Sequence, residues 1–281
     1  MKKVESNIIV LIHGAFVSSE TWTPWKDYFS SKGYHVLAPP WPHKNASANE
    51  LRRRHPDPDV ASLRLQQLVD HYAEIIRELP EKPILIGHSM GGLITQLLLN
   101  KGYAAAGIAI HSVPPQGVIP TEFSFYRGGW KSLGLFTSTQ KTYLMTLKDW
   151  QYAFTNGMTI KEQQDSYNRY AVPESKLIAR DALTSVAKID FEKPHEPLLF
   201  IASKADNIIP ASLNYRNFKR YAKNGSVTAY KEFEGRNHYV VGLPTWHEEA
   251  GYILNWLNTS GEEKGNVTIL PMNQFSETSV L

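Results

Sequence analysis

A serine, an acid and a histidine are the residues of this chain whose types suit nucleophilic catalysis. Ser89 lies in Gly87-His88-Ser89-Met90-Gly91-Gly92, with glycine two positions before it and two positions after it. A serine hydroxyl is a weak nucleophile at neutral pH and needs a neighbouring base, for which an imidazole oriented by a carboxylate is suited. His238 and Asp206 follow later in the chain. The three residues are therefore candidates for a nucleophile, its base and the acid that orients the base.

The glycines around Ser89 fit a turn that joins a strand to a helix. An apolar run at 83–86 leads into the turn and predicts a buried strand. Leucine and isoleucine follow at 93, 94, 97 and 98, which is helical spacing, and the helix is expected to end near Gly102. A side chain raised out of so sharp a turn crowds its neighbours, so positions 87 and 91 need to lack a Cβ. This context favours a nucleophile over an incidental serine in a glycine-rich turn.

The other candidates also follow predicted strands. Apolar runs at 8–12, 197–202 and 227–233 end shortly before His13, Asp206 and His238, and further strands are expected at 34–38 and 106–110. Strands that alternate with helices and are buried on both faces indicate a mainly parallel sheet. Ligands of such sheets bind beyond the carboxyl ends of the strands. We therefore expect these residues and Ser89 to meet at one edge of the sheet.

The predicted fold class is α/β, with a mainly parallel central sheet flanked by helices. The strand–helix alternation covers 1–116 and 188–259, which we expect to form the core. Between 117 and 187 the alternation stops and aromatic residues gather, which predicts a mostly helical insertion. The stretch 43–59 shows little periodicity and is expected to be a long loop. The polar stretch 260–281 is expected to be a flexible C-terminal tail.

Composition limits the class of protein. The chain has 281 residues, 42% hydrophobic and 20% charged, which suits a globular protein with a sizeable core. Its net charge of +3 is too small to indicate a nucleic-acid partner. No apolar run approaches the ~20 residues that span a bilayer, and the N-terminus lacks the pattern of a signal peptide. We expect a cytoplasmic protein that acts on a small molecule; its oligomeric state is not indicated.

No metal or cofactor is expected. The chain has no cysteine, so disulfides, thiolate metal sites and a cysteine nucleophile are excluded. A histidine and two aspartates occur at 55–59, but the two prolines among them and the lack of a second cluster favour a loop over a metal site. No glycine-rich phosphate loop is present, so a nucleotide cofactor is not indicated.

The combined motifs resemble those of the α/β-hydrolase fold superfamily, and within it serine esterases that carry a helical cap. The chain order serine, acid, histidine is the order found in such enzymes. The insertion falls where that family carries its cap. The likeness extends over roughly residues 5–259, and its motifs are His13-Gly14-Ala15-Phe16, the Ser89 turn, Asp206-Asn207-Ile208-Ile209-Pro210 and Gly235-Arg236-Asn237-His238.

The resemblance implies an acyl-serine route. Ser89 would attack a carbonyl and form an acyl-enzyme. His238 would take the Ser89 proton, return a proton to the leaving group and then activate water, while Asp206 would orient His238. The aromatic insertion suggests that the substrate is a small-to-medium apolar carboxylic ester, or a thioester or activated amide.

The resemblance also implies the groups around the nucleophile. The backbone N–H groups of Met90 and Ala15 would form the oxyanion hole. Phe16 and His88 would contact substrate as walls of the pocket, and His13 would brace its own loop. Phe16 stands where many relatives have proline, which weakens any inference about the substrate from the family alone.

Other interpretations of the same residues stay open. One alternative is that Asp206 serves only as a helix cap, and another is that His238 is an ordinary loop histidine. The same three residues would also serve a lyase or a C–C bond hydrolase, because these chemistries differ in pocket shape. A ligand receptor without catalysis is a further alternative, against which the complete set of three residues argues.

Overall fold

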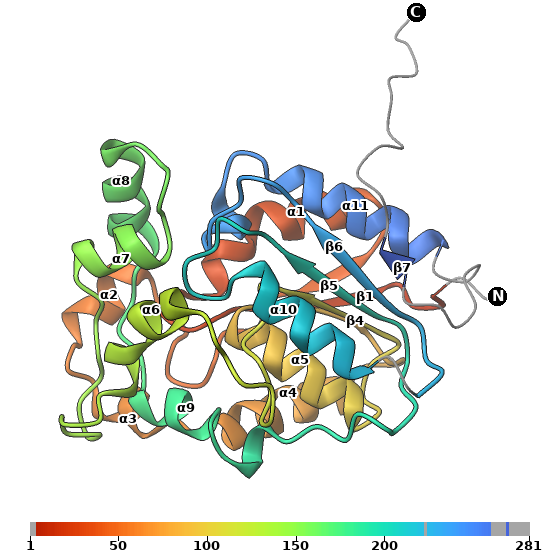
Figure 1. Ribbon diagram of the computed structural model, residues 1–281, viewed down its shortest axis with the longest axis horizontal. Helices are drawn as coiled ribbons and strands as arrows, with labels where there is room; N and C mark the ends of the chain where they lie inside the picture. Colours follow the sequence, from red (N-terminus) through yellow and green to blue (C-terminus); the bar gives the residue numbers. More distant parts are fainter. Residues whose placement is uncertain (1–3, 222–223, 260–267, 270–281) are drawn as a thin grey trace, which may run out of the picture.

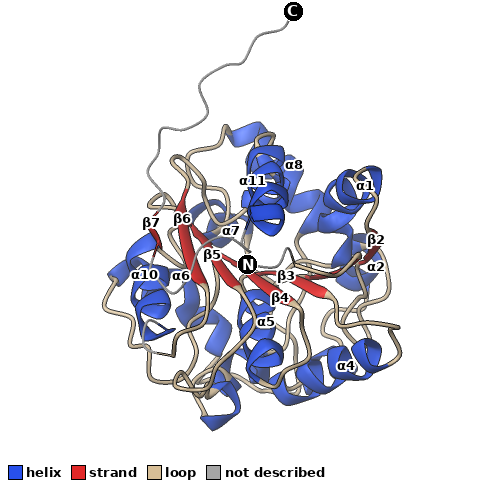
Figure 2. Cartoon of the chain, turned by 90° about the vertical axis from the view of Figure 1, so that its right-hand side faces the viewer, coloured by secondary structure: helices blue, strands red, loops and turns tan. Residues whose placement is uncertain are grey.

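A parallel sheet forms the centre of the protein, and the prediction of an α/β fold with a mainly parallel sheet is confirmed. The computed structural model describes residues 4–221, 224–259 and 268–269. Neighbouring strands of the sheet are parallel, in the order β2-β1-β3-β4-β5-β6-β7 (Figures 1 and 2). The strands are β1 (Ile8–Ile12), β2 (His35–Leu37), β3 (Ile84–His88), β4 (Ala106–Ile110), β5 (Leu198–Ala202), β6 (Thr228–Glu232) and β7 (Thr268–Ile269).

Helices cover both faces of the sheet, as Figure 2 shows. Alternate side chains of the apolar strands point to opposite faces, so the sheet contributes to two hydrophobic cores. None of the described helices is both long and apolar enough to cross a membrane. One face carries η1 (Ser19–Trp22), α1 (Thr23–Ser31), η4 (Val240–Gly242) and α11 (Trp246–Thr259), and the other carries α4 (Leu65–Arg77), α5 (Met90–Asn100), α10 (Ala211–Phe218) and η3 (Lys219–Tyr221).

The register of the sheet brings strand ends together. Gly87 of β3 pairs with Ile12 of β1, and His88 pairs with Ile110 of β4. The residue that follows each of these strands, Ser89 after β3 among them, therefore emerges at the same edge. This edge is where the sequence places its candidate site.

The segment between β4 and β5 is helical. Figure 1 shows most of its helices on the left-hand side of the molecule. Among its described residues, the antiparallel bridge between Tyr143 and Glu174 is the only strand-like pairing. Its role as a cap, and the boundaries at 117 and 187, stay predictions. The helices are α6 (Phe123–Leu133), α7 (Leu147–Ala153), α8 (Ile160–Tyr170), α9 (Lys176–Asp181) and η2 (Ser185–Ala187).

The stretch 43–59 differs from the long loop that was expected. It contains α2 (Ala48–Arg53) and runs into α3 (Pro58–Ser62). Each helix begins at a polar residue, Ser47 or Asp57, whose side chain accepts a hydrogen bond from a backbone N–H of the first turn. With 6 and 5 residues, the two helices are too short for an apolar period to show in the sequence.

The C-terminal stretch 260–281 is described only in part. Thr268–Ile269 lie within it and pair with Ala229 and Tyr230 of β6, although no strand was expected there. The rest of the stretch lies outside the described residues, so the flexible tail expected for it stays a prediction.

Gly91 has no room for a side chain. A Cβ there would lie 2.1 Å from the carbonyl oxygen of Ile12, which belongs to β1 and cannot move without disturbing the sheet. Replacing Gly91 with alanine is therefore expected to lower the free energy of unfolding by about 3 kcal/mol or more, or to prevent folding.

A matched control for this prediction is Gly129→Ala in α6, where, apart from the adjacent residues and the backbone of the helix itself, no heavy atom lies within 4 Å of the added Cβ. Helix propensity favours alanine over glycine by about 0.5–1 kcal/mol, so this variant should keep or gain stability. Urea unfolding measures both changes. Equal midpoints for the two variants would contradict the packing argument.

Candidate active site

Ser89 occupies a strained turn at the end of β3. Its backbone has φ 57° and ψ −117°, a left-handed conformation that costs a non-glycine residue roughly 1–3 kcal/mol. The Ser89 N–H donates to the carbonyl of Ile110 at 2.9 Å, which fixes the turn to β4. A Cβ on Gly87 would lie 2.1 Å from the carbonyl oxygen of Gly91, so the turn closes only with glycine at position 87. The turn lifts the Ser89 side chain above the sheet edge.

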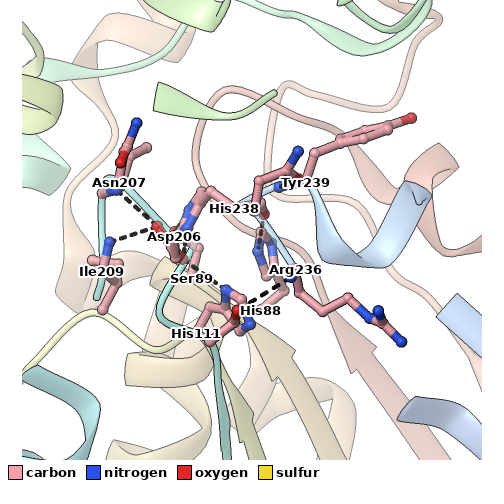
Figure 3. A network of polar contacts seen from close by, with 12 residues as sticks. His88, Ser89, His111, Asp206, Asn207, Ile209, Arg236, His238 and Tyr239 are labelled. Atoms are coloured by element: carbon pink, nitrogen blue, oxygen red, sulfur yellow. Dashed lines mark hydrogen bonds and ion pairs between the residues drawn. The ribbon is translucent and has the colours of Figure 1, made fainter. Parts of the chain in front are cut away.

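The structure brings Ser89, His238 and Asp206 into one chain of hydrogen bonds (Figure 3). The Ser89 hydroxyl donates to His238 Nε2 at 3.0 Å, and His238 Nδ1–H donates to Asp206 Oδ2 at 2.7 Å. All three residues are buried. The arrangement leaves Nε2 as the acceptor of the Ser89 proton, which is the tautomer that general-base activation requires.

Asp206 is held as a carboxylate by four N–H donors. Its Oδ1 accepts from the backbone of Ile208 at 2.7 Å and Ile209 at 2.8 Å, and its Oδ2 accepts from His238 and His111. Burial alone would raise the pKa of Asp206, but the nearby His238 and the hydrogen bonds from both imidazoles outweigh it and hold the pKa well below its usual range. The hydrogen bonds from the Ile208 and Ile209 amides resemble those of a helix cap, but the Asp206 carboxylate also orients the His238 ring.

His111 is a part of this site that the sequence analysis did not identify. It follows β4 directly, has φ 46°, and its Nδ1–H donates to Asp206 Oδ2 at 2.6 Å. The Asp206 oxygen therefore receives two imidazole N–H groups, and Figure 3 shows Asp206 between the two rings. The signal was present in the sequence, because a polar residue follows the buried strand 106–110 as Ser89 follows its own strand.

His88 does not lie where it was expected. It was assigned to the wall of the substrate pocket, but its ring is 1% exposed and it is not among the residues that line the cavity beside Ser89. Its Nε2–H donates to the backbone carbonyl of His238 at 2.9 Å. Because its side chain points into the interior below the turn, burial lowers its pKa well below the usual value and keeps it neutral. His88 supports the loop that carries His238.

Two backbone amides are available to bind an oxyanion. Ala15 and Met90 both line the cavity that contains Ser89. Among the described residues, no acceptor receives a hydrogen bond from either amide. The loop that carries Ala15 approaches the nucleophile closely, since a Cβ on Gly14 would lie 2.9 Å from Ser89 Cβ. These positions suit donors to a negative oxygen that develops on a carbon bonded to Ser89.

The cavity in front of Ser89 is large and apolar. It has a volume of about 510 Å³ and extends from Ser89 between α6 and α9. Phe16, which was expected to contact substrate, lies on its wall. Of the described residues that line it, none is lysine or arginine, and Glu174 and His238 are the only acidic or imidazole groups. Such a lining favours a ligand that is mostly apolar.

The side chains of His111, Asp206 and His238 also resemble a set of metal ligands, since their ligand atoms lie within 4.8 Å of one another. Both histidines, however, direct Nδ1–H at the Asp206 carboxylate. An ion between them would have to displace those hydrogens and break the bonds that orient His238. We therefore assign this cluster to the Ser89 site and not to a metal.

The low pKa of Asp206 leads to a prediction for stability in acid. A carboxyl group in an unfolded chain titrates at about 3.9, above the pKa of Asp206 in the folded protein. As the pH falls below about 4, the unfolded state takes up a proton that the folded state does not bind, so the stabilising contribution of Asp206 decreases.

We therefore compare the free energy of unfolding of the wild type with that of Asp206→Asn. The difference should be constant at about pH 5–7. Below about pH 4 it should become smaller, because the wild type loses stability that the variant never had. Urea titrations across this range test the expectation. A difference that does not change with pH would contradict it.

Comparison with known proteins gives matches of two kinds. A hydrolase from Acinetobacter baylyi, named (E)-2-((N-methylformamido)methylene)succinate hydrolase, is 40% identical over 93 residues, which is 32% of this chain and 31% of that protein. The match thus spans about a third of that protein's length. A monoacylglycerol lipase from Paleococcus ferrophilus has a similar structure, with a TM-score of 0.63 and 21% identity, covering 90% of this chain and 94% of that chain. A pyrethroid hydrolase from Sphingobium faniae gives 0.62 and 19%, covering 91% and 99%.

At these identities the structural neighbours show a shared fold and nothing finer. The family is shown by the sequence itself, which matches the alpha/beta hydrolase family over residues 9–250. This range includes β2 to β6, all of β1 except Ile8, and all three residues of the Ser89–His238–Asp206 chain. The resemblance to the α/β-hydrolase superfamily inferred from the motifs is confirmed, and the protein belongs to the alpha/beta hydrolase family.

Proposed function

We propose that this protein hydrolyses a small-to-medium, uncharged and apolar carboxylic ester through an acyl-serine intermediate. The observation that carries the proposal is the chain of hydrogen bonds from Ser89 through His238 to Asp206, at 3.0 and 2.7 Å, beside two available backbone amides. A strained, buried serine with a base in hydrogen-bonding contact is arranged for attack on an electrophilic carbon.

The first half of the reaction forms the acyl-enzyme. The ester carbonyl binds with its oxygen toward the Ala15 and Met90 amides, and Ser89 Oγ attacks its carbon while His238 Nε2 accepts the hydroxyl proton. The imidazolium that results is stabilised by Asp206. Negative charge develops on the carbonyl oxygen, and removal of one donor to such an oxygen costs about 10²–10³ in rate. His238 then gives its proton to the leaving alcohol, and the C–O bond breaks.

The second half repeats these steps with water. His238 Nε2, again neutral, takes a proton from a water molecule that attacks the acyl carbon. Collapse of this second tetrahedral intermediate returns the proton to Ser89 Oγ and releases the acid. His88 and His111 contribute by holding the His238 backbone and the Asp206 carboxylate in place.

The lining of the cavity supports an uncharged substrate. The name of the Acinetobacter relative contains a succinate, which bears two carboxylates, and so suggests a charged substrate as a second candidate. The described lining residues of this protein provide no lysine or arginine to pair with a carboxylate. We therefore propose a neutral ester as the substrate in preference to a dicarboxylate.

A panel of p-nitrophenyl esters from acetate to decanoate, together with a hemisuccinate ester, tests the proposal. We expect the wild type to hydrolyse the neutral esters faster than the charged one. Ser89→Ala should lower kcat by at least about 10⁴-fold, because loss of a nucleophile leaves only the binding contribution to catalysis. Equal rates for the wild type and Ser89→Ala would contradict the acyl-serine route.

Labelling with a fluorophosphonate separates the alternatives. A protein that labels on Ser89 but hydrolyses no ester on the panel would point to a lyase or a C–C bond hydrolase that uses the same residues. A protein that neither labels nor turns over an ester would point to a receptor that binds its ligand without chemistry.

The α9 wall of the cavity offers a test of where the acyl chain of an ester binds. Ala179 of α9 is partly exposed and lies on the wall of the cavity. Replacement with phenylalanine fills part of this space and should lower kcat/KM for the decanoate ester at least about tenfold, since steric exclusion in a pocket acts at the level of 1–3 kcal/mol. The acetate ester serves as the internal control and should change less than about twofold. Equal losses of kcat/KM for both esters would mean that the acyl chain of the ester does not bind beside Ala179.

A further inference from the structure

A buried ion pair lies beside the Ala15 loop and has no role in the proton transfers. Lys44 Nζ is 2.6 Å from Glu174 Oε2, and the two side chains are 0% and 2% exposed. Burial lowers the pKa of Lys44, and the negative charge of Glu174 opposes that shift. A buried pair gains little net stability, because the loss of hydration offsets the attraction between the charges. The other groups that these two side chains bind therefore indicate what the pair does.

The pair binds the backbone of the loop that follows β1. The Phe16 N–H donates to Glu174 Oε2 at 3.2 Å, and Lys44 Nζ donates to the Val17 carbonyl at 3.0 Å. The Phe16 carbonyl accepts from the Val172 N–H at 3.0 Å. The polar backbone groups of this loop are thus satisfied by the segment 172–174 from the insertion and by a lysine from the stretch 43–59.

Phe16 needs such support because its backbone is strained. Its φ is 65°, in the left-handed region that bulky residues rarely adopt. Such a conformation persists only where the surroundings fix it. The residue immediately before it, Ala15, lines the cavity of Ser89, and its N–H has no acceptor among the described residues. The orientation of the Phe16 peptide limits the orientation of the Ala15 amide, since only the two dihedral angles of Ala15 separate them.

We propose that Glu174, held in place by Lys44, is a positioning residue for the oxyanion hole: it captures the Phe16 N–H and so directs the Ala15 N–H toward the reacting carbonyl. This inference rests on the proposed acyl transfer at Ser89. It gives the insertion a part in catalysis, because the carboxylate that aligns a core loop comes from outside the core.

A second set of contacts ties the same loop to Lys44. The Trp41 ring lies 4.7 Å from Lys44 Nζ and stacks on His13 with ring centroids 4.5 Å apart. His13 Nε2 accepts the Trp41 N–H at 3.3 Å, and its Nδ1–H donates to the Gly14 carbonyl at 2.8 Å. Both ends of the loop, His13 before Ala15 and Phe16 after it, are therefore connected to Lys44.

The test compares two double variants that both lack the ion pair. Lys44→Met with Glu174→Gln keeps an oxygen that accepts the Phe16 N–H, whereas Lys44→Met with Glu174→Met does not. Neither leaves a buried charge unpaired, so both are expected to fold. The melting temperature of each is measured, and kcat and KM for a p-nitrophenyl ester are compared with the rate at which a fluorophosphonate labels Ser89.

We expect kcat and the labelling rate of the methionine double variant to be ten- to a hundredfold below those of the glutamine double variant, the scale of a misplaced oxyanion donor. KM should differ by less than about twofold, because the interaction acts on the transition state. Equal kcat and labelling rates in the two variants, or a loss that appears in KM alone, would overturn the proposal. Wild type that labels on Ser89 but hydrolyses no ester would defeat the proposed function, while the labelling rates would still test the role of Glu174.

A crystal structure of the phosphonylated wild type gives a test that does not depend on folding of the variants. The phosphoryl oxygen should accept from Met90 N–H and Ala15 N–H, with the Phe16 N–H still on Glu174. A phosphoryl oxygen bound to the Phe16 N–H, or a Phe16 N–H no longer bound to Glu174, would overturn the proposal.

Discussion

The turn after β3 is the constraint on which the rest of the site depends. Ser89 is kept at φ 57° because β3 must pass at once into α5, which packs so closely on the sheet that Gly91 touches the carbonyl of Ile12. The strain is stable because the packing on both sides leaves no alternative path for the chain. It places the hydroxyl above the sheet edge, and Met90, the next residue, also lines the cavity. The proposed nucleophile and one proposed oxyanion donor thus come from one backbone conformation.

Polar groups around Ser89 are concentrated in a small buried cluster, and the substrate space beside it is apolar. Asp206 binds four N–H donors, of which two belong to its own loop and two to imidazoles. Each of these donors stabilises the negative charge of Asp206 and also fixes the position of the carboxylate. Because His238 is hydrogen-bonded to that carboxylate, the same donors restrict the orientation of its ring. The residues that form these bonds are buried, which makes each bond stronger than it would be in solvent.

The insertion between β4 and β5 is connected to the core by more than packing. Glu174 and Val172 supply hydrogen-bond partners to Phe16, and the Phe154 carbonyl accepts from the N–H of Tyr239, the residue after the candidate base. The core sheet sets where the strands end, but the loops beyond those ends take part of their shape from the insertion.

Much of the fold follows from local patterns. The apolar runs of β1, β3, β4 and β5 are long enough to be predicted as strands. Because helical patterns separate these strands along the chain, a parallel sheet could also be predicted. The short helices α2 and α3 could not, because their 6 and 5 residues depend on the caps at Ser47 and Asp57 and not on an apolar period. Thr268–Ile269 is a strand of only two residues, and its pairing with β6 is a contact that the polar stretch around it did not predict.

The sequence by itself determined the chemistry that is available: a serine in a glycine turn, an acid and a histidine after later strands, and no cysteine. Only the tertiary structure decided how these groups are supported. His88 points below the sheet edge and not into the pocket, His111 shares the Asp206 oxygen, and Glu174 reaches Phe16 across 158 positions of the chain. Periodicity reports which face of an element is buried, but contacts between distant loops depend on the packing of the whole molecule, which no local pattern contains.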